Sequence, residues 1–445
     1  MALKGGKRVR EFNWELLIYY LLGLIFLERL AFFFYLGPTA LANADDVGYV
    51  GSAIYFAKTG VLSVWSQEPT AGIMPGTTIL AGSLVYLLGE GTAFMAVTKL
   101  IYICLGTMTA WFLYRAARLF VPTPYALLTA ACLLMPNRAW IDNLISTETP
   151  YLAFFCMNLY YMLKMRWDKS RSCTVWYGVS FVLALLFRAN ILVMPVFGLF
   201  YLALCRNHSW KEILGRTAVC VGIALIFLVP WTIRNYLLFD EFIPITDGAG
   251  DPTLKGSYQG DTCPADDDLD YETNVYSVVR EKYSRYFGED GECRTDAYKN
   301  HFRAVEKLAK AKYRMKVWFS NNPGGFLRSY LFEKPVSMLN WVYYWGPYQE
   351  QIEPFTKLMS RINLLLCAAG GLLALLWKQK REIVLFLSAL YFTNIYLISC
   401  SFAVERYAAL LMPLRYLIAS VGLFVMAQGV SRLRGRANLR KTVHE

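Results

Sequence analysis

The sequence predicts an all-α polytopic membrane protein with about ten transmembrane helices. Charged residues make up 18% of its 445 residues, whereas they make up about a quarter of an average soluble protein. The mean hydropathy is +0.34. Long apolar runs alternate with short charged clusters, as expected when hydrocarbon replaces water around the helices. Many aromatic residues stand near the ends of these runs, which is typical of interfacial belts.

The apolar runs place the spans. The first run, Leu16 to Leu36, is too long for the core of a cleaved signal peptide and lacks a convincing small-residue cleavage site, so we expect it to remain as a span. The full set of expected spans is 15–36, 92–114, 123–137, 147–163, 174–188, 190–205, 214–237, 362–377, 382–401 and 405–428.

Basic clusters set the sides of the membrane. The net charge of +12 gathers at segment ends and termini, which the positive-inside rule explains without a nucleic-acid partner. The clusters expected inside are Lys4, Lys7, Arg8 and Arg10; Arg115 and Arg118; Lys164, Arg166, Lys169 and Arg171; Arg206, Lys211 and Arg216; Lys378, Lys380 and Arg381; and Arg432 to Lys441. Both termini are then inside.

Residues 73–89 are apolar but short, and they contain Pro75. A span here would move every later basic cluster outside, so we expect a re-entrant or interfacial element instead.

The topology divides the chain into three parts: a transmembrane module at 1–237 with a first outer loop at 37–91, an outer segment at 238–361, and C-terminal spans with a basic tail at 362–445. Because the large polar segments are outside, we expect the protein to work there.

The first outer loop reads NADDVGYVGSAIYFAKTG. Asn43 could cap a helix whose first turn holds Asp45 and Asp46, and Gly60 could end it. An apolar stripe follows at Val47, Val50, Ile54 and Val61. Ionised acids just outside a span are candidates for function. The alternative is that they simply stabilise the first turn of the helix.

An Asp followed by an acid, with Tyr49 a turn later, resembles the catalytic loop of GT-C superfamily glycosyltransferases, in particular the protein O-mannosyltransferase and aminoarabinose transferase branch. Four further segments are similar to that branch: QEPTAGIMPGTTILAGSLVYLLG, PNRAWIDNLISTETPYLAFF, PWTIRNYLLFDEFIPITDGAG and ERYAALLMPL. The resemblance covers about 1–250 well and 317–428 loosely. Two features depart from it. The pair is Asp-Asp where many members have Asp-Glu, and Gln67-Glu68-Pro69 and Met74-Pro75-Gly76 replace a common Lys-Pro-Pro.

The resemblance implies transfer of a hexosyl or pentosyl group from a polyprenyl-phosphate donor to an acceptor hydroxyl at the outer face. Asp45 is our candidate general base with Asp46 as its partner, since adjacent carboxylates can separate their pKa values. For the lipid phosphate we favour arginines at outer span ends, because Arg forms paired hydrogen bonds with phosphate. The alternative for each is snorkelling or pairing with an acid such as Glu405. The candidate substrate-binding residues are Tyr49, Glu68, Asp142, Glu148, Arg188, Arg234, Arg406 and Tyr407, with Arg138 and Lys334 as weaker options for the phosphate.

No cofactor is assigned, and a divalent metal at the outer acids stays open. The run Asp266 to Asp268 with Asp270 lacks the Gly and distal Glu of a calcium loop, so we expect a solvated acidic loop. Cys263 and Cys293 could form a disulfide if the outer side is oxidising. The aromatic stretch from Val317 to Gly346 is expected to lie along the membrane and roof the cavity.

The expected localisation is a bacterial plasma membrane, with an exported glycan, lipid or protein as the acceptor. Three alternatives remain. A lipid-linked oligosaccharide flippase or polymerase would share the spans and outer arginines but would not need the Asp pair. A secondary transporter would carry ionisable residues in the middle of spans, whereas charges here are mainly at span ends. A membrane scaffold would leave the ordered motifs unexplained.

Overall fold

The computed structural model describes residues 14–205, 207–340, 349–376, 378 and 380–442. Within these ranges the chain is helical, and the only β-type pairing is an isolated bridge between Phe287 and Cys293. The all-α fold class is therefore confirmed. The N-terminal basic cluster from Lys4 to Arg10, Arg206 and the end of the tail lie outside the described residues.

Long apolar helices form the membrane part of the molecule. In the described part of the chain, six helices are long and apolar enough to cross a membrane. They are α1 (Leu17–Leu36), α4 (Thr92–Arg118), α10 (Trp210–Phe239), α16 (Gln349–Leu376), α17 (Arg381–Ser399) and α19 (Met412–Thr442). These helices make the chain an integral membrane protein.

The remaining predicted spans are helices of 17 residues or fewer and are not among these six, so the number ten is not confirmed. They correspond to α5 (Thr123–Ala131), α7 (Glu148–Lys164), α8 (Arg171–Leu185) and α9 (Val193–Leu204). The prediction of one helix over 123–137 is wrong. Met135 is extended at φ −143° and ψ 133°, and α6 (Pro136–Ile141) starts afresh with Pro136 at its first position. A proline disfavours helical geometry in the residue before it, which explains the break.

The first outer loop forms α2 (Asp45–Thr59), followed by α3 (Gly76–Leu88). Gly60 ends α2 in the left-handed region at φ +71°, as predicted. The predicted cap at Asn43 is wrong, because Asn43 itself has a φ of +55° and Ala44 occupies the cap position. The 13 residues of α3 extend about 20 Å, which is short of the roughly 30 Å hydrocarbon core. This length agrees with the non-spanning interpretation of residues 73–89.

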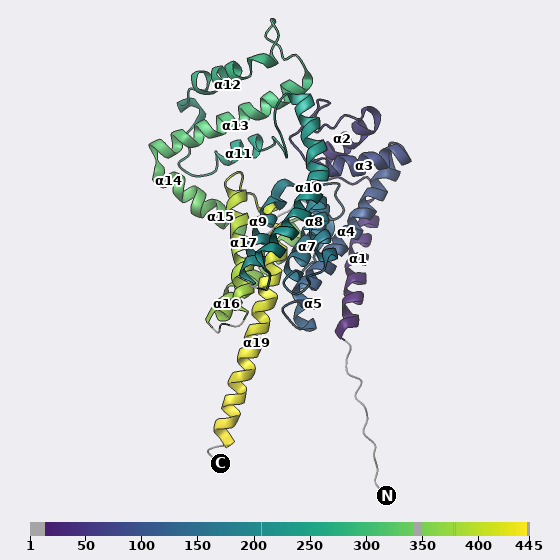
Figure 1. Ribbon diagram of the computed structural model, residues 1–445, viewed down its shortest axis with the longest axis vertical. Coiled ribbons are helices and arrows are strands. Elements are labelled where there is room, and N and C mark those ends of the chain that lie inside the picture. The colour runs from purple at the N-terminus through teal and green to yellow at the C-terminus, as the bar shows by residue number, and fades with distance from the viewer. Residues whose placement is uncertain (1–13, 206, 341–348, 377, 379, 443–445) are drawn as a thin grey trace.

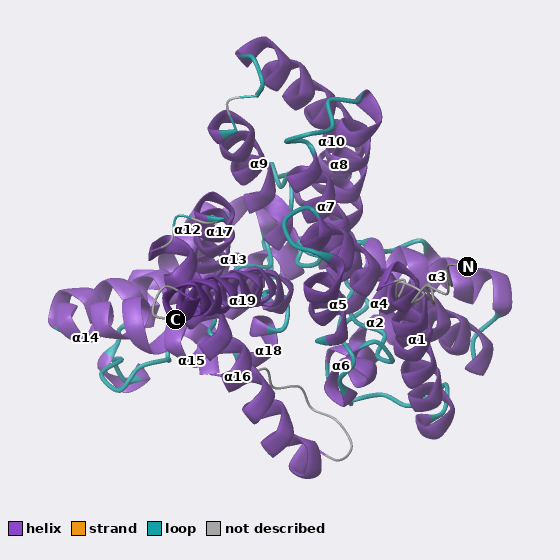
Figure 2. Ribbon diagram, turned by 90° about the horizontal axis from the view of Figure 1, so that it is seen from below, coloured by secondary structure: helices purple, strands orange, loops and turns teal. Residues whose placement is uncertain are grey.

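The outer segment is also helical. Its helices are α11 (Gly250–Gly256), α12 (Ser277–Lys282), α13 (Asp296–Asn321), α14 (Pro323–Arg328) and α15 (Lys334–Asn340). Figure 1 shows α11 to α14 at one end of the molecule, near α2 and α3, while α1 begins and α19 ends at the opposite end. Seen from below, α8 to α10 form one lobe and α1 to α4 a second (Figure 2), while α16 and α17 both pack against α19.

The structure corrects one prediction for the outer segment and decides one question left open there. Asp266 is not merely solvated, because it forms an ion pair with Arg314, a fully buried residue, and accepts hydrogen bonds from the hydroxyls of Tyr258 and Tyr271. Cys263 and Cys293 are both free thiols and do not form the disulfide considered above. Ion pairs and aromatic packing therefore take the place of a covalent link in this segment.

Candidate active site

Glu148 is the centre of the candidate site. It is the first residue of α7, and it is 1% exposed. Its Oε1 atom accepts hydrogen bonds from Nε and Nη2 of Arg406, at 2.9 and 2.6 Å, and from Nη1 of Arg188, at 3.0 Å. A buried carboxylate is stable in the ionised form only when it is paired in this way. Glu148 thus fixes two guanidinium groups that come from distant parts of the chain.

Asp45 joins this cluster through Arg406. Its Oδ2 atom lies 2.7 Å from Nη1 of Arg406, and its side chain is 45% exposed. Arg406 belongs to α18 (Glu405–Ala408), a single turn between α17 and α19. Tyr49 lies one turn after Asp45, among the charges of Glu148, Arg188 and Asp45, and burial raises its pKa. The Tyr49 phenol therefore keeps its proton at neutral pH and can donate a hydrogen bond.

Asp46 faces away from this cluster into its own loop. Its carboxylate accepts hydrogen bonds from the backbone N–H groups of Ala42, at 2.5 Å, and Ala44, at 2.9 Å, and the residue is 2% exposed. These contacts give Asp46 a structural task, which is to hold the turn that precedes α2. The two adjacent carboxylates thus have different partners, whereas the sequence analysis expected them to act as a pair.

Lys99 holds the same loop from the opposite side. It belongs to α4 and is 1% exposed, and its Nζ donates to the carbonyl oxygens of Ala40, at 2.6 Å, and Gly37, at 3.4 Å. Lys99 is not among the residues predicted for the site. The sequence signal that could have found it is a lysine about two turns inside an apolar helix.

A cavity of about 270 Å³ adjoins the cluster. Arg188 and Tyr407 line it together with Asn190, Asn394 and Ser401. The guanidinium carbon of Arg188 lies 5.2 Å from the centre of the Tyr407 ring, a distance typical of a cation–π contact. The cavity continues toward Leu397 and Ile398 of α17, so that a cationic end is joined to an apolar wall.

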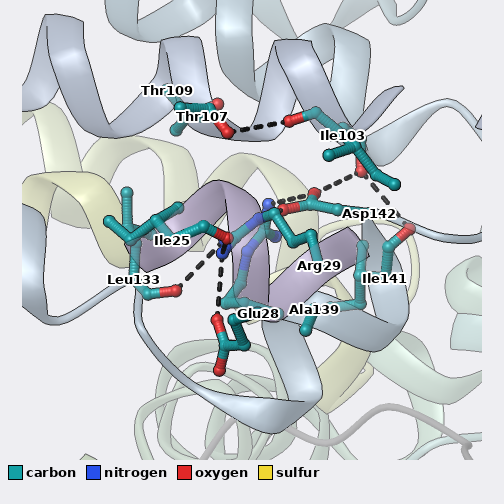
Figure 3. Close-up of polar contacts among 12 residues, drawn as sticks. Ile25, Glu28, Arg29, Ile103, Thr107, Thr109, Leu133, Ala139, Ile141 and Asp142 are labelled. Atoms are coloured by element: carbon teal, nitrogen blue, oxygen red, sulfur yellow. Dashed lines mark hydrogen bonds and ion pairs between the residues drawn. The ribbon is translucent and has the colours of Figure 1, made fainter. Parts of the chain in front are cut away.

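Asp142 belongs to a second buried network (Figure 3). It is fully buried, and its carboxylate accepts from Nε of Arg29 at 2.7 Å, Nη2 of Arg138 at 2.9 Å and the Thr149 hydroxyl at 2.7 Å. Arg29 also contacts Glu28, at 3.1 Å. Because Glu28 and Arg29 stand within the first span, the statement that charges lie mainly at span ends is wrong for α1. Thr149 follows Glu148 directly and connects the two networks.

Two predicted site residues lie elsewhere. Glu68 forms ion pairs with Arg303, at 3.0 Å, and Lys299, at 3.8 Å, both on α13, so it joins the first outer loop to the outer segment. Arg234 donates to the backbone oxygen of Thr70, at 2.7 Å, and packs on the ring of Trp231. Among the described residues, no hydrogen bond or ion pair joins either of them to the Glu148 cluster.

Lys334, the weaker phosphate candidate, also has a structural place. It is 3% exposed, and its Nζ donates to the carbonyl oxygen of Gly256, at 2.7 Å. For a divalent metal, the described residues contain no group of three or more His, Cys, Asp or Glu side chains that could hold an ion.

Comparison with known proteins supports the fold. Residues 77–233, about a third of the chain, match the family model described as dolichyl-phosphate-mannose-protein mannosyltransferase. No curated protein sequence matches the chain. Among solved structures, the archaeal oligosaccharyltransferase AglB from Archaeoglobus fulgidus, in complex with an inhibitory peptide and a dolichol-phosphate, is similar with a TM-score of 0.54 at 12% identity. That alignment covers 96% of this chain and 52% of AglB, so the chain spans about half of that protein.

Two further structures are more distant. ArnT from Cupriavidus metallidurans, bound to undecaprenyl phosphate, gives a TM-score of 0.43 at 13% identity, covering 94% of this chain and 78% of ArnT. The S. cerevisiae O-mannosyltransferase complex Pmt1-Pmt2, bound to its sugar donor, gives a TM-score of 0.40 at 17% identity. That alignment covers 57% of this chain and 38% of the other.

The chain therefore has the GT-C fold of membrane glycosyltransferases, and the resemblance noted from its motifs is confirmed. Within that class, the segment that matches the protein mannosyltransferase family runs from α3 to α10 and contains Glu148 and Arg188.

Proposed function

We propose that this protein transfers one sugar from a polyprenyl-phosphate carrier to an acceptor hydroxyl on the outer face of a bacterial plasma membrane. The observation that carries the proposal is the continuous contact from Asp45 through Arg406 and Glu148 to Arg188. It joins a partly exposed carboxylate directly to one oriented guanidinium group and, through Glu148, to a second. A glycosyl transfer from a phosphate carrier needs these two groups side by side.

The reaction assigns one task to each group. The acceptor oxygen attacks the anomeric carbon, a new C–O bond forms there, and the bond from that carbon to the phosphate oxygen breaks with its electron pair staying on the phosphate. Asp45 takes the acceptor proton. Arg188 and Arg406 stabilise the charge that grows on the lipid phosphate, because preorganised donors act most strongly where charge develops.

Arg406 connects the two tasks. Its Nη1 atom faces Asp45, while Nε and Nη2 stay on the buried Glu148. A donor phosphate in the adjacent cavity of about 270 Å³ would compete with Asp45 for Nη1 and release the carboxylate toward the acceptor. In this proposal Tyr49 donates a hydrogen bond to the sugar or phosphate, and Asp46 positions the loop.

The test is a transfer assay on purified full-length protein in lipid nanodiscs, with radiolabelled polyprenyl-phosphate sugars and a mixture of hydroxyl acceptors. The proposal expects release of polyprenyl phosphate together with labelled product. Arg188→Ala should abolish this release, and Arg166→Ala, which removes a residue paired with Glu382 at the opposite end of the bundle, should preserve it.

A flippase would give a different result in liposomes. The intact sugar lipid would cross the bilayer, its phosphate bond would remain whole, and Asp45→Asn would not change the rate. That outcome would overturn the proposal.

A further inference from the structure

A second and larger cavity lies on the other side of the candidate site. Its volume is about 390 Å³, and it is enclosed by α5, α6, α16 and α19. Most of its wall is apolar, with side chains such as Leu133, Met359 and Leu366. At its edge Leu128 is 48% exposed, Phe355 48% and Ile362 40%. Because α16 and α19 belong to the membrane part of the chain, the half-exposed edge is a lateral opening toward hydrocarbon.

The cavity has one polar end with unused hydrogen-bonding atoms. The side chain of Arg138 is 7% exposed, and Asn137 is 8% exposed as a residue. In the part of the chain that the structure describes, no hydrogen-bond partner is found for Nε of Arg138, Oδ1 of Asn137 or Oγ of Ser360. Buried polar atoms in folded proteins are normally paired. Three unpaired atoms around one cavity therefore point to a ligand with a polar head.

The length of the cavity suits a chain within one leaflet. Met412 and Leu423, both on α19, line it, and the helical rise separates them by about 16 Å. This is about half of the roughly 30 Å hydrocarbon core, which fits an acyl chain. An undecaprenyl tail is several times longer.

The polar end also adjoins the candidate site. Arg138 binds Asp142, which accepts from Thr149, the neighbour of Glu148. The turn that carries Arg406 separates the two cavities, since Tyr407 lines the smaller one and Ala409 the larger one. The smaller cavity thus carries Arg188, while the larger one is mainly apolar with Arg138 at its polar end.

We propose that the larger cavity binds an apolar chain of the acceptor, and that the acceptor is therefore a hydroxyl-bearing membrane lipid. This inference rests on the proposed function, because it assigns the acceptor class to the same site. Asn137, Arg138 and Ser360 bind the polar head group, and the chain lies along α16 and α19. The donor phosphate remains at Arg188 on the other side.

The test uses full-length protein in nanodiscs with a photoreactive diacylglycerol, which carries acyl chains and one hydroxyl. Cross-links mapped by mass spectrometry are expected at Cys132 or Met359. Leu128→Trp at the edge and Ala131→Trp in the wall should each abolish them. Val196→Trp, at a 65% exposed position on α9, is the matched control and should leave them unchanged. Two positions are used so that a folding defect in one variant does not decide the result.

Binding of undecaprenyl phosphate is measured in parallel. It should be unchanged in Leu128→Trp and lost in Arg188→Ala, whereas photolabelling of the cavity should persist in Arg188→Ala. Labels spread evenly over the lipid-facing helices, or unaffected by both tryptophans, would overturn the inference and leave the transferase proposal intact. Loss of undecaprenyl phosphate binding in Leu128→Trp would show that the cavity holds the donor tail, which also overturns it. Persistent donor binding in Arg188→Ala would instead count against the proposed function.

Discussion

The Nη1 atom of Arg406 lies 2.7 Å from the Oδ2 atom of Asp45. The two residues are far apart in sequence, and the contact forms because Glu148, at the start of α7, holds the rest of the guanidinium group that α18 carries. The pair therefore joins the proposed base to the proposed phosphate ligand in one geometry.

Arg406→Lys is expected to weaken binding of undecaprenyl phosphate. Lysine keeps the positive charge, but its ammonium group lacks the planar set of donors with which arginine can bind Glu148 and a phosphate at the same time. The loss of charge-assisted hydrogen bonds predicts an affinity about tenfold to a hundredfold lower. Arg234→Lys is the control, since Arg234 binds Thr70 instead. Equal affinities in wild type and Arg406→Lys would contradict this role.

Glu148→Gln is expected to destabilise the fold as well as reduce transfer. The substitution leaves Arg188 and Arg406 buried beside each other without the carboxylate that they share. Breaking a buried ion pair in this way costs about 3–5 kcal/mol. The measurement is the midpoint of thermal unfolding in detergent.

Glu382→Gln gives the matched control for Glu148→Gln. The Glu382 side chain is 83% exposed and pairs with Arg166, and such surface pairs contribute about 0–1 kcal/mol. If both variants shift the midpoint equally, Glu148 does not anchor the cluster.

Lys99→Met is expected to impair catalysis through the loop that it holds. Without the ammonium group, the carbonyls of Gly37 and Ala40 lose their donor, and the start of α2 with Asp45 is no longer fixed. A misplacement near 1 Å can reduce the rate about a hundredfold. We therefore expect a lower kcat with nearly unchanged donor affinity, and partial recovery in Lys99→Arg. A change in donor affinity alone, with kcat preserved, would argue against positioning.

Lys334 predicts a pH dependence of stability. Burial lowers its pKa to about 7, whereas an unfolded lysine titrates near 10.4. Between these values the unfolded chain holds more protons than the folded one, so the free energy of unfolding rises with pH in that window and is lowest below pH 7. The difference in the free energy of unfolding between wild type and Lys334→Met should therefore change with pH in this window. The same difference for Lys316→Met, at an exposed position on α13, should not. A stability difference between wild type and Lys334→Met that does not change with pH would contradict the lowered pKa of Lys334.

The sequence was a good guide to the helices and a partial guide to the site. Apolar runs and caps depend on local composition, so the long helices and the stop at Gly60 were predictable. The helix predicted over 123–137 is broken before Pro136, although the apolar run continues up to Met135. Proline acts on the backbone whatever the polarity of its neighbours.

The structure brings Asp45, Glu148, Arg188 and Arg406 into one cluster, while their roles in transfer stay a prediction. The separation of Asp45 from Asp46 could not be predicted, since the direction of each carboxylate depends on the turn at Asn43, which has a φ of +55°. The pairing of Arg29 with Asp142 joins residues 113 positions apart. No local sequence pattern predicts a contact between residues so far apart. The two charged residues inside the first apolar run were nevertheless a visible signal of a buried polar site.

The most direct test is the single-turnover rate of sugar transfer in Asp45→Asn, measured with purified protein at a saturating concentration of polyprenyl-phosphate sugar. The account predicts a rate about a hundredfold to ten-thousandfold lower, the usual contribution of a general base, with donor affinity retained. A rate equal to that of wild type would contradict the assignment of Asp45 as the base.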